Sequence, residues 1–409
     1  YRLPTESAPS PGWRTVLLSL KAQDSYAWVH FTGGNSLKRF VSLHFHTCLD
    51  SPLTNSNPYP ILFSERRHGE DSFCMGALSC TVVAPPSWPG FRRIPLASLR
   101  ANTVTSFDIY ISVDGTAPPV LYRGQDVAVS QENLAVLADR GRVEILVPAS
   151  QEAAYQQYIE DNLDLILSDE STPVEERSQV LYESATNLMR SVFDSPRSPE
   201  MVSRSKAMVA NATALLRNEK AAFEHLLSLV SFDYYTYTHS VNVFVFSYML
   251  AQYSGYSDPA VLQELGEGTL LHDIGKSMMD SAIVQCQGPL SDGQWEEMKK
   301  HPEYGHEILR QHNAFGELAL DIVLHHHEKL NGNGYPHGLK DHEIHPLVRI
   351  STIADIFDAM TTRRPYRDAV DSFPALQVMR DEMRDALDPA LFRMFVEMMG
   401  NPRRDRANV

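Results

Sequence analysis

The sequence predicts a multidomain protein with an all-α helical bundle at its C-terminal end, a smaller α/β or β-rich domain before it, and a helical connector between them. Three observations predict this arrangement. Apolar residues recur with a helical period almost throughout residues 226–400, apolar and polar positions alternate within residues 93–150, and helix start signals recur in residues 151–225. Residues 1–92 are left unassigned, either irregular or a small β unit, and residues 401–409 form a tail.

Two stretches predict the strands of the smaller domain. The stretch "SFDIYISVDGTAPPVLYRG" alternates apolar and polar residues on both sides of Asp114-Gly115, which is the signal of a β-hairpin. The stretch "GRVEILVPA", residues 141–149, predicts a further strand.

The connector carries helical spacing in "EAAYQQYIEDNLDLIL" and two predicted helix starts after it. Thr172 is followed by a proline and, three residues on, by Glu175, which predicts a capping box. Ser198, again before a proline, predicts a second start of the same kind. Apolar positions such as Leu181 and Leu188 need a partner surface, either in this chain or in a second copy, so a homodimer through the connector is one expected arrangement.

The predicted bundle has start and stop signals of its own. Ser291 is expected to cap a helix together with Gln294, three residues later. The stretch "DPALFRMFVEMMG" predicts a last helix with a proline start and a glycine stop.

Charge and hydropathy exclude several classes of partner. The formal net charge of −15 at pH 7 opposes binding to a nucleic acid polymer or an anionic membrane surface. The longest strongly apolar stretch, "VNVFVFSYMLA", is about half the length that a bilayer span needs, so no membrane span is expected. No leader peptide is evident, and the cytoplasm is the expected location. The four cysteines form no CxxC pair and predict neither a disulfide framework nor a zinc ribbon.

A His-Asp pair in "VLQELGEGTLLHDIGK" gives the first indication of chemistry. Helical spacing places His272 and Asp273 on the face of Leu265. Burying an unpaired carboxylate there would cost several kcal/mol, and an adjacent cation removes that cost. Because a carboxylate has two oxygens, Asp273 can bridge two cations. Taken in isolation, the pair is explained more simply as a helix cap or a surface ion pair.

Further histidines follow along the chain. His301 precedes Pro302, which predicts a position at the start of a helix. In "DIVLHHHEKL", His326 lies one turn after the apolar face, and the following "NGNGYP" predicts a helix end. Near a helix end two neighbouring imidazoles can converge on one site, but periodicity does not choose between His325 and His327 as the second one.

Acids and a lysine complete the set. In the apolar segment around Asp355 and Asp358, one carboxylate is expected to bind a metal and the other to orient an imidazole, unless both are solvated surface acids.

With His239 added, these histidines and acids can saturate two divalent cations, and Fe, Mn, Ni, Co and Zn all accept such ligands. Two cations can neutralise a phosphodiester and produce hydroxide at neutral pH. Lys276, one turn after His272, can hold a phosphate oxygen.

The order of these motifs resembles a known family. "HDIGK", "HPEYG", "HHEKLNGNGYPHGL" and "ADIFDAMTTRRPYR" are similar to the successive motifs of the HD-GYP phosphodiesterases, a branch of the HD metal-dependent phosphohydrolases. The resemblance covers roughly residues 226–400. It implies an HD-type helical bundle that binds iron, manganese or a related metal. It also implies hydrolysis of cyclic di-GMP to linear pGpG, and whether a second cleavage to GMP follows stays open.

The resemblance also implies roles for individual residues. It implies that one metal is held by His239, His272, Asp273 and Asp355, and the other by Asp273, His301, His326 and His327. Asp273 and Lys276 are the expected catalytic residues. The resemblance adds Arg364 and Arg367 as ligand contacts, and a loop of Gly334, Tyr335 and Pro336 that lines the pocket and docks a signalling partner such as a GGDEF-type protein.

Two positions depart from the family pattern. Tyr235 stands where some members have a glutamate that helps to bind a third metal, so two metals are expected. Asn331 stands where the family usually has an aspartate, which removes a charge near the turn. Two alternatives therefore stay open: an HD phosphohydrolase that acts on another nucleotide, and a weakly active module that binds the messenger or a partner protein.

Overall fold

A computed structural model gives the structure of the protein. It describes residues 88–112, 118–139, 144–230, 236–286, 288–362 and 370–400, and the backbone of five short strands within the first 87 residues. The chain divides into two compact units, Tyr1–Ala84 and Pro85–Val409.

The first unit contains two small antiparallel sheets. Strands β1 (Trp13–Thr15), β2 (Ala27–Thr32) and β3 (Val41–Phe45) pair in that order, and β4 (Pro60–Ile61) pairs with β5 (Leu78–Ser79).

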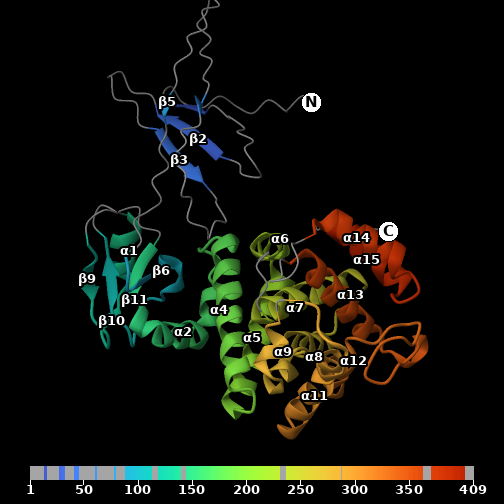
Figure 1. Ribbon diagram of the computed structural model, residues 1–409. Coiled ribbons are helices and arrows are strands. Elements are labelled where there is room, and N and C mark those ends of the chain that lie inside the picture. The colour runs from blue at the N-terminus through green and yellow to red at the C-terminus, as the bar shows by residue number, and fades with distance from the viewer. Residues whose placement is uncertain are drawn as a thin grey trace, which may run out of the picture. The chain divides into compact units, whose positions relative to one another are not determined.

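The second unit begins with a four-stranded antiparallel sheet (Figure 1). Its order is β6 (Phe91–Pro95), β11 (Glu144–Pro148), β8 (Ile109–Ile111) and β9 (Val120–Arg123). The short strands β7 (Thr103–Val104) and β10 (Ala128–Val129), the helix α1 (Gln131–Asp139) and the 3₁₀ turns η1 (Leu96–Ser98) and η2 (Ala149–Gln151) accompany it. Strand β8 pairs with β9 on either side of the predicted turn, whose Asp114-Gly115 lies outside the described residues, and β11 is the other predicted strand. The predicted β-rich region is confirmed.

Five helices follow the sheet. They are α2 (Glu152–Asp161), α3 (Leu163–Ser168), α4 (Val174–Asp194), α5 (Pro199–Asn218) and α6 (Lys220–Leu229). The capping box predicted at Thr172 is wrong, because the Thr172 hydroxyl donates to Asp169 Oδ2 at 3.1 Å and no side chain caps α4. Ser198 does precede α5, but its side chain makes no capping hydrogen bond either.

The apolar face of α4 is buried within the chain. Leu181 and Leu188 are 3% and 0% exposed, and α4 packs against α5, α6 and the first helix of the bundle. No second copy is needed to cover this face, so it gives no support to the expected homodimer.

The helical bundle fills the rest of the second unit. Its helices are α7 (Thr236–Tyr253), α8 (Pro259–Leu270), α9 (Ser281–Val284), α10 (Asp292–Met298), α11 (His301–Gln311), α12 (Glu317–His325), α13 (Pro346–Thr361), α14 (Ser372–Glu382) and α15 (Pro389–Gly400), with 3₁₀ turns η3 (Ile274–Met278) and η4 (Asp341–Glu343). The capping box predicted at Ser291 is confirmed at the start of α10, and α15 begins at the predicted proline.

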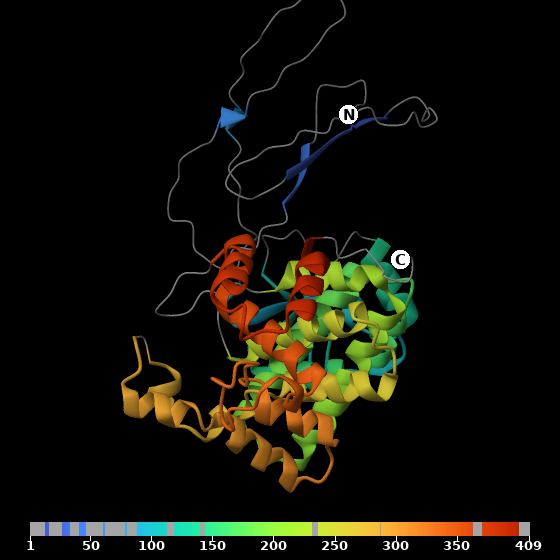
Figure 2. The same ribbon diagram turned by 90° about the vertical axis from the view of Figure 1, so that its right-hand side faces the viewer.

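Helix α7 forms the centre of the bundle and packs against α4, α8, α13 and α15. It is buried on nearly all sides, which explains why its sequence is apolar almost throughout. Phe246 of α7 meets Phe357 of α13 and Phe395 of α15 edge to face. Within the described residues, no helix combines the length and apolar character that crossing a bilayer requires. The segment that carries α9 and α10, gold in Figure 2, projects from one side of the bundle.

Candidate metal centre

The His-Asp pair lies just beyond the end of α8. Helical spacing predicted His272 and Asp273 on that helix. This prediction is wrong, because α8 ends at Leu270 and both residues occupy the turn before η3. Both are 1% exposed. Gly275 lets η3 approach α11 closely, since a Cβ there would lie 1.9 Å from the backbone oxygen of His301. The turn therefore sets the pair against the start of α11.

Three histidines come from the two helices that follow. His301 is the first residue of α11, as predicted. Helix α12 ends at His325, so the next two residues, His326 and His327, can face the same side. His325 points elsewhere: its Nδ1 lies 2.6 Å from Asp321 Oδ1 and its Nε2 lies 2.9 Å from His337 Nδ1.

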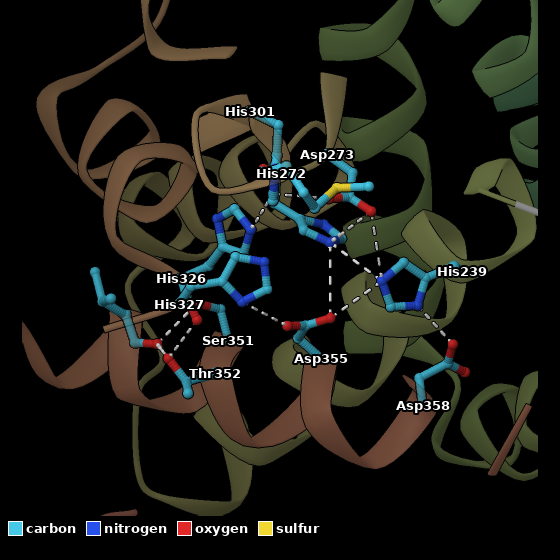
Figure 3. A network of polar contacts seen from close by, with 12 residues as sticks. His239, His272, Asp273, His301, His326, His327, Ser351, Thr352, Asp355 and Asp358 are labelled. Carbon is cyan, nitrogen blue, oxygen red and sulfur yellow. Dashed lines mark hydrogen bonds and ion pairs between the residues drawn. The ribbon is translucent and has the colours of Figure 1, made fainter. Parts of the chain in front are cut away.

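Helices α7 and α13 supply the remaining groups. His239 Nε2 lies 3.1 Å from Asp355 Oδ1. Asp358, one turn after Asp355, bonds the other nitrogen of His239, with 2.7 Å between Nδ1 and Oδ2 (Figure 3). The two acids therefore occupy the two positions that the sequence left open, one inside the cluster and one behind the imidazole.

These side chains form two adjacent clusters, drawn together in Figure 3. One contains Asp273, His301, His326 and His327, and the other contains His239, His272 and Asp355. Asp273 faces both, with Oδ1 3.3 Å from His301 Nε2 and Oδ2 3.5 Å from His272 Nε2. The structure thus brings together all seven residues that the family resemblance implies as metal ligands.

The hydrogen bonds of the imidazoles determine where their lone pairs point. In four of them Nδ1 faces an acceptor: Thr269 O for His272, Met298 O for His301, Val323 O for His326, and the Asp358 carboxylate for His239. Because these acceptors carry no proton, each Nδ1 donates and each Nε2 holds a lone pair. The Nε2 atoms nevertheless face each other in pairs, 3.3 Å apart for His239 and His272, and 3.2 Å apart for His301 and His326.

Facing lone pairs repel each other, and a cation between them turns the repulsion into attraction. Asp273 Oδ1 is also buried and has no hydrogen-bond partner among the described residues, although a buried polar atom normally has one. Neutral imidazoles and carboxylates are the donor set of Zn, Mn and Fe sites. The two clusters are therefore consistent with a binuclear metal site.

Burial and neighbouring charges shift the pKa values in the clusters. Burial lowers the pKa of His327 to about 3 and holds the pKa of His326 well below its usual value. Burial alone would raise the pKa of Asp273, but the adjacent Lys276 ammonium holds it well below its usual value. Neutral imidazoles and an ionised carboxylate are the forms that bind a metal.

The other predicted site residues lie at the edge of the clusters or outside the described residues. Lys276 Nζ donates to Asp273 Oδ2 at 2.5 Å, and the Tyr335 ring lies 4.7 Å from the His327 ring between centroids. Gly334 packs tightly, since a Cβ there would lie 2.5 Å from the backbone of Glu328, and Pro336 follows Tyr335 in the same loop. Arg364, Arg367 and Tyr235 fall outside the described residues.

Sequence reasoning missed Glu328, which holds this loop. Its carboxylate is buried and accepts hydrogen bonds from three consecutive backbone N–H groups, those of His337, Gly338 and Leu339, at 2.7, 3.0 and 2.9 Å. The only available signal was an acid directly after three histidines, whose partners are main-chain groups that a sequence does not display.

Asn331 stabilises the turn that precedes the loop of Gly334, Tyr335 and Pro336. Its Oδ1 accepts from the backbone N–H of Asn333 at 3.0 Å, a contact that an aspartate would also make. Its Nδ2 donates to Asp385 Oδ2 at 3.3 Å, a contact that an aspartate could not make. The departure from the family pattern is therefore matched by a local partner.

Comparison with known proteins finds matches to the same part of the chain. Residues 224–391 match the family model described as HD domain. The chain is 36% identical over 189 residues to "Cyclic di-GMP phosphodiesterase PA4108" of Pseudomonas aeruginosa, covering 46% of this chain and 45% of that protein. It is 39% identical over 158 residues to "3'3'-cGAMP-specific phosphodiesterase 3" of Vibrio cholerae, covering 39% of this chain and 34% of that protein. Each match thus spans less than half of the relative.

One solved structure shares the fold. Bd1817, described as an HDG"Y"P protein from Bdellovibrio bacteriovorus, superposes with a TM-score of 0.54 and covers 76% of this chain and all of its own. At 21% sequence identity the likeness concerns the fold alone.

Proposed function

Since residues 224–391 match an HD domain and hold two buried His/Asp clusters, we propose that this protein is a metal-dependent phosphodiesterase that hydrolyses cyclic di-GMP to linear pGpG, or further to GMP. The observation that carries the proposal is the convergence of four Nε2 lone pairs around Asp273, whose Oδ1 has no hydrogen-bond partner among the described residues. The names of the relatives support a cyclic dinucleotide as the substrate.

The proposed metal ligands are the seven clustered residues. His239, His272, Asp273 and Asp355 would hold one ion, and Asp273, His301, His326 and His327 the other, with iron or manganese as the expected metals. When bound, two divalent metals neutralise phosphate charge and lower the pKa of water. Asp273 would link the two ions because its two oxygens face different clusters.

The other residues would bind and orient the substrate. Lys276 is positioned beside Asp273 and would donate to a non-bridging phosphate oxygen. Burial raises the pKa of Tyr335, so its hydroxyl stays protonated and can donate. By resemblance, Arg364 and Arg367 are proposed as further phosphate contacts, and the loop at Gly334 as a docking element for a signalling protein.

A substrate panel tests the proposal. Metal-loaded protein, purified without oxygen, is expected to convert cyclic di-GMP to pGpG, with the product identified by chromatography. Asp273→Ala should abolish hydrolysis, whereas the exposed Asp164→Ala should not. The proposal is wrong if the wild-type protein, shown to be folded and metal-loaded, hydrolyses no cyclic dinucleotide, or if Asp273→Ala keeps full activity.

A second candidate substrate is 3'3'-cGAMP, because one relative is named as specific for it. The same panel decides between the two through the ratio of their kcat/KM values.

A further inference from the structure

Among the described side chains in and beside the clusters, those of His327 and Lys276 are the most exposed. The side chains of His239, His272, Asp273 and His301 are 1% exposed. Those of His327 and Lys276 are 24% and 14% exposed. A substrate would therefore reach the centre past His327 and Lys276.

Aromatic rings lead outward from this opening. The Tyr335 ring lies over His327, with centroids 4.7 Å apart and an interplanar angle of 34°. The Trp295 ring meets Tyr335 edge to face, with centroids 6.2 Å apart and an angle of 81°. Trp295 is thus two ring contacts away from a proposed metal ligand.

Trp295 is not part of the hydrophobic core. It is 47% exposed, and α10, which carries it, buries none of its residues. The capping box formed by Ser291 and Gln294 fixes the first turn of this short helix. Helix α10 lies in the segment that projects from the bundle in Figure 2. An aromatic ring that is 47% exposed is therefore held beside Tyr335, and much of its surface is available to a ligand.

We propose that Trp295 stacks on one purine base of the cyclic dinucleotide while the scissile phosphodiester lies at the metal centre. The proposal rests on the proposed function, because it needs a substrate with bases. A cyclic dinucleotide carries two bases outside its phosphate ring, so one base projects beyond the centre when a phosphate is bound there. Stacking on an aromatic side chain is tolerant of base identity, so Trp295 strengthens binding of cyclic di-GMP and 3'3'-cGAMP alike.

Kinetics with two substitutions test the stacking. Trp295→Ala is expected to raise KM for cyclic di-GMP about 5- to 150-fold, the range of stacking on one base, with kcat nearly unchanged. Trp295→Phe should restore most of the affinity, because phenylalanine keeps a ring. Phe373→Ala, which removes another exposed aromatic side chain on α14, should leave KM unchanged.

Fluorescence gives a readout that does not depend on turnover. A non-hydrolysable phosphorothioate analogue of cyclic di-GMP, added to metal-loaded full-length protein, should quench tryptophan fluorescence, and the quenching should disappear in Trp295→Phe. If the protein hydrolyses cyclic di-GMP but Trp295→Ala leaves KM and quenching unchanged, the stacking is overturned and the function stands; Trp295 would then suit a protein contact instead. If the protein hydrolyses no cyclic dinucleotide and the analogue causes no quenching, both fail.

Discussion

At the scale of single residues, the candidate site depends on which nitrogen of each imidazole carries the proton. Main-chain oxygens fix the proton on Nδ1 of His272, His301 and His326, and Asp358 does the same for His239. Each Nε2 therefore acts as an acceptor, and these atoms face each other in pairs. The groups that accept hydrogen bonds from the Nδ1 atoms therefore help to determine how the imidazoles bind a metal.

Replacing Asp358 tests this directly. Asp358 accepts from His239 Nδ1 through Oδ2 and from Asn242 Nδ2 through Oδ1. Asp358→Asn would leave an amide N–H₂ facing one of these two donors, so we expect metal affinity to fall about 10- to 100-fold. Competition with a chromophoric chelator measures the affinity, with Asp164→Asn as the exposed control. Unchanged affinity in Asp358→Asn would refute the orienting role.

Asn331 gives a milder prediction. Asn331→Asp keeps the turn but places a second carboxylate near Asp385, which is exposed. We expect a loss of stability below about 1 kcal/mol, because exposed charges interact weakly, and little change in turnover. Thermal unfolding and the cyclic di-GMP assay measure the two effects. A large loss of turnover would show that the asparagine itself is needed at this position.

At the scale of elements, the contact between η3 and α11 sets the distance between Asp273 and His301. A Cβ on Gly275 would lie 1.9 Å from His301 O and 2.5 Å from Gly305 N, so Gly275→Ala must separate the two elements. We expect it to destabilise the protein by about 1–3 kcal/mol and to weaken metal retention. Gly293→Ala, in open space on α10, should instead stabilise by about 0.5–1 kcal/mol.

Urea unfolding and metal content after dialysis report on both glycine variants. If Gly275→Ala matched Gly293→Ala in both measurements, close packing at this contact would not matter for the site.

The sequence predicted elements well where the signal is local. The capping box at Ser291 needs only residues of its own turn, and it forms. The box predicted at Thr172 fails because Asp169, which a capping pattern does not consider, takes the hydroxyl. Likewise, helical periodicity predicted that α8 continues through His272. In the structure α8 ends at Leu270, and the turn after it packs closely against α11.

The candidate site shows the same limit. Spacing alone could not choose between His325 and His327, and the resemblance to a family favoured His327, which the structure places in a cluster. The main-chain partners of Glu328 come together only in the folded loop, so no sequence pattern indicated them.

At the scale of the whole molecule, the connector and the bundle share one core. Leu181, Val209, Leu226, Phe244 and Leu270, from five successive helices, line the same small internal space. A buried chain of hydrogen bonds extends this contact to the candidate site. Tyr182 of α4 donates to Asn242 Oδ1 at 2.9 Å, and Asn242 donates to Asp358, which holds His239.

Because of these hydrogen bonds, we expect a substitution in the connector to change metal affinity at the candidate site. Tyr182→Phe removes one buried hydroxyl, which should cost about 0.5–1.5 kcal/mol of stability. It should also weaken metal affinity, by less than Asp358→Asn does, because two residues, Asn242 and Asp358, lie between Tyr182 and His239. Tyr253→Phe, whose hydroxyl bonds Glu397 at the surface, is the control. If both tyrosine variants had the same metal affinity, the hydrogen bonds from α4 would not contribute to metal binding.

Elemental analysis of the protein purified without oxygen tests the binuclear centre most directly. Two transition-metal ions per chain are expected in the wild-type protein, and Asp273→Ala should lose both, because one oxygen of Asp273 faces His301 and the other faces His272. A wild-type protein that holds no metal under these conditions, or an Asp273→Ala variant that keeps two ions, would contradict the shared centre.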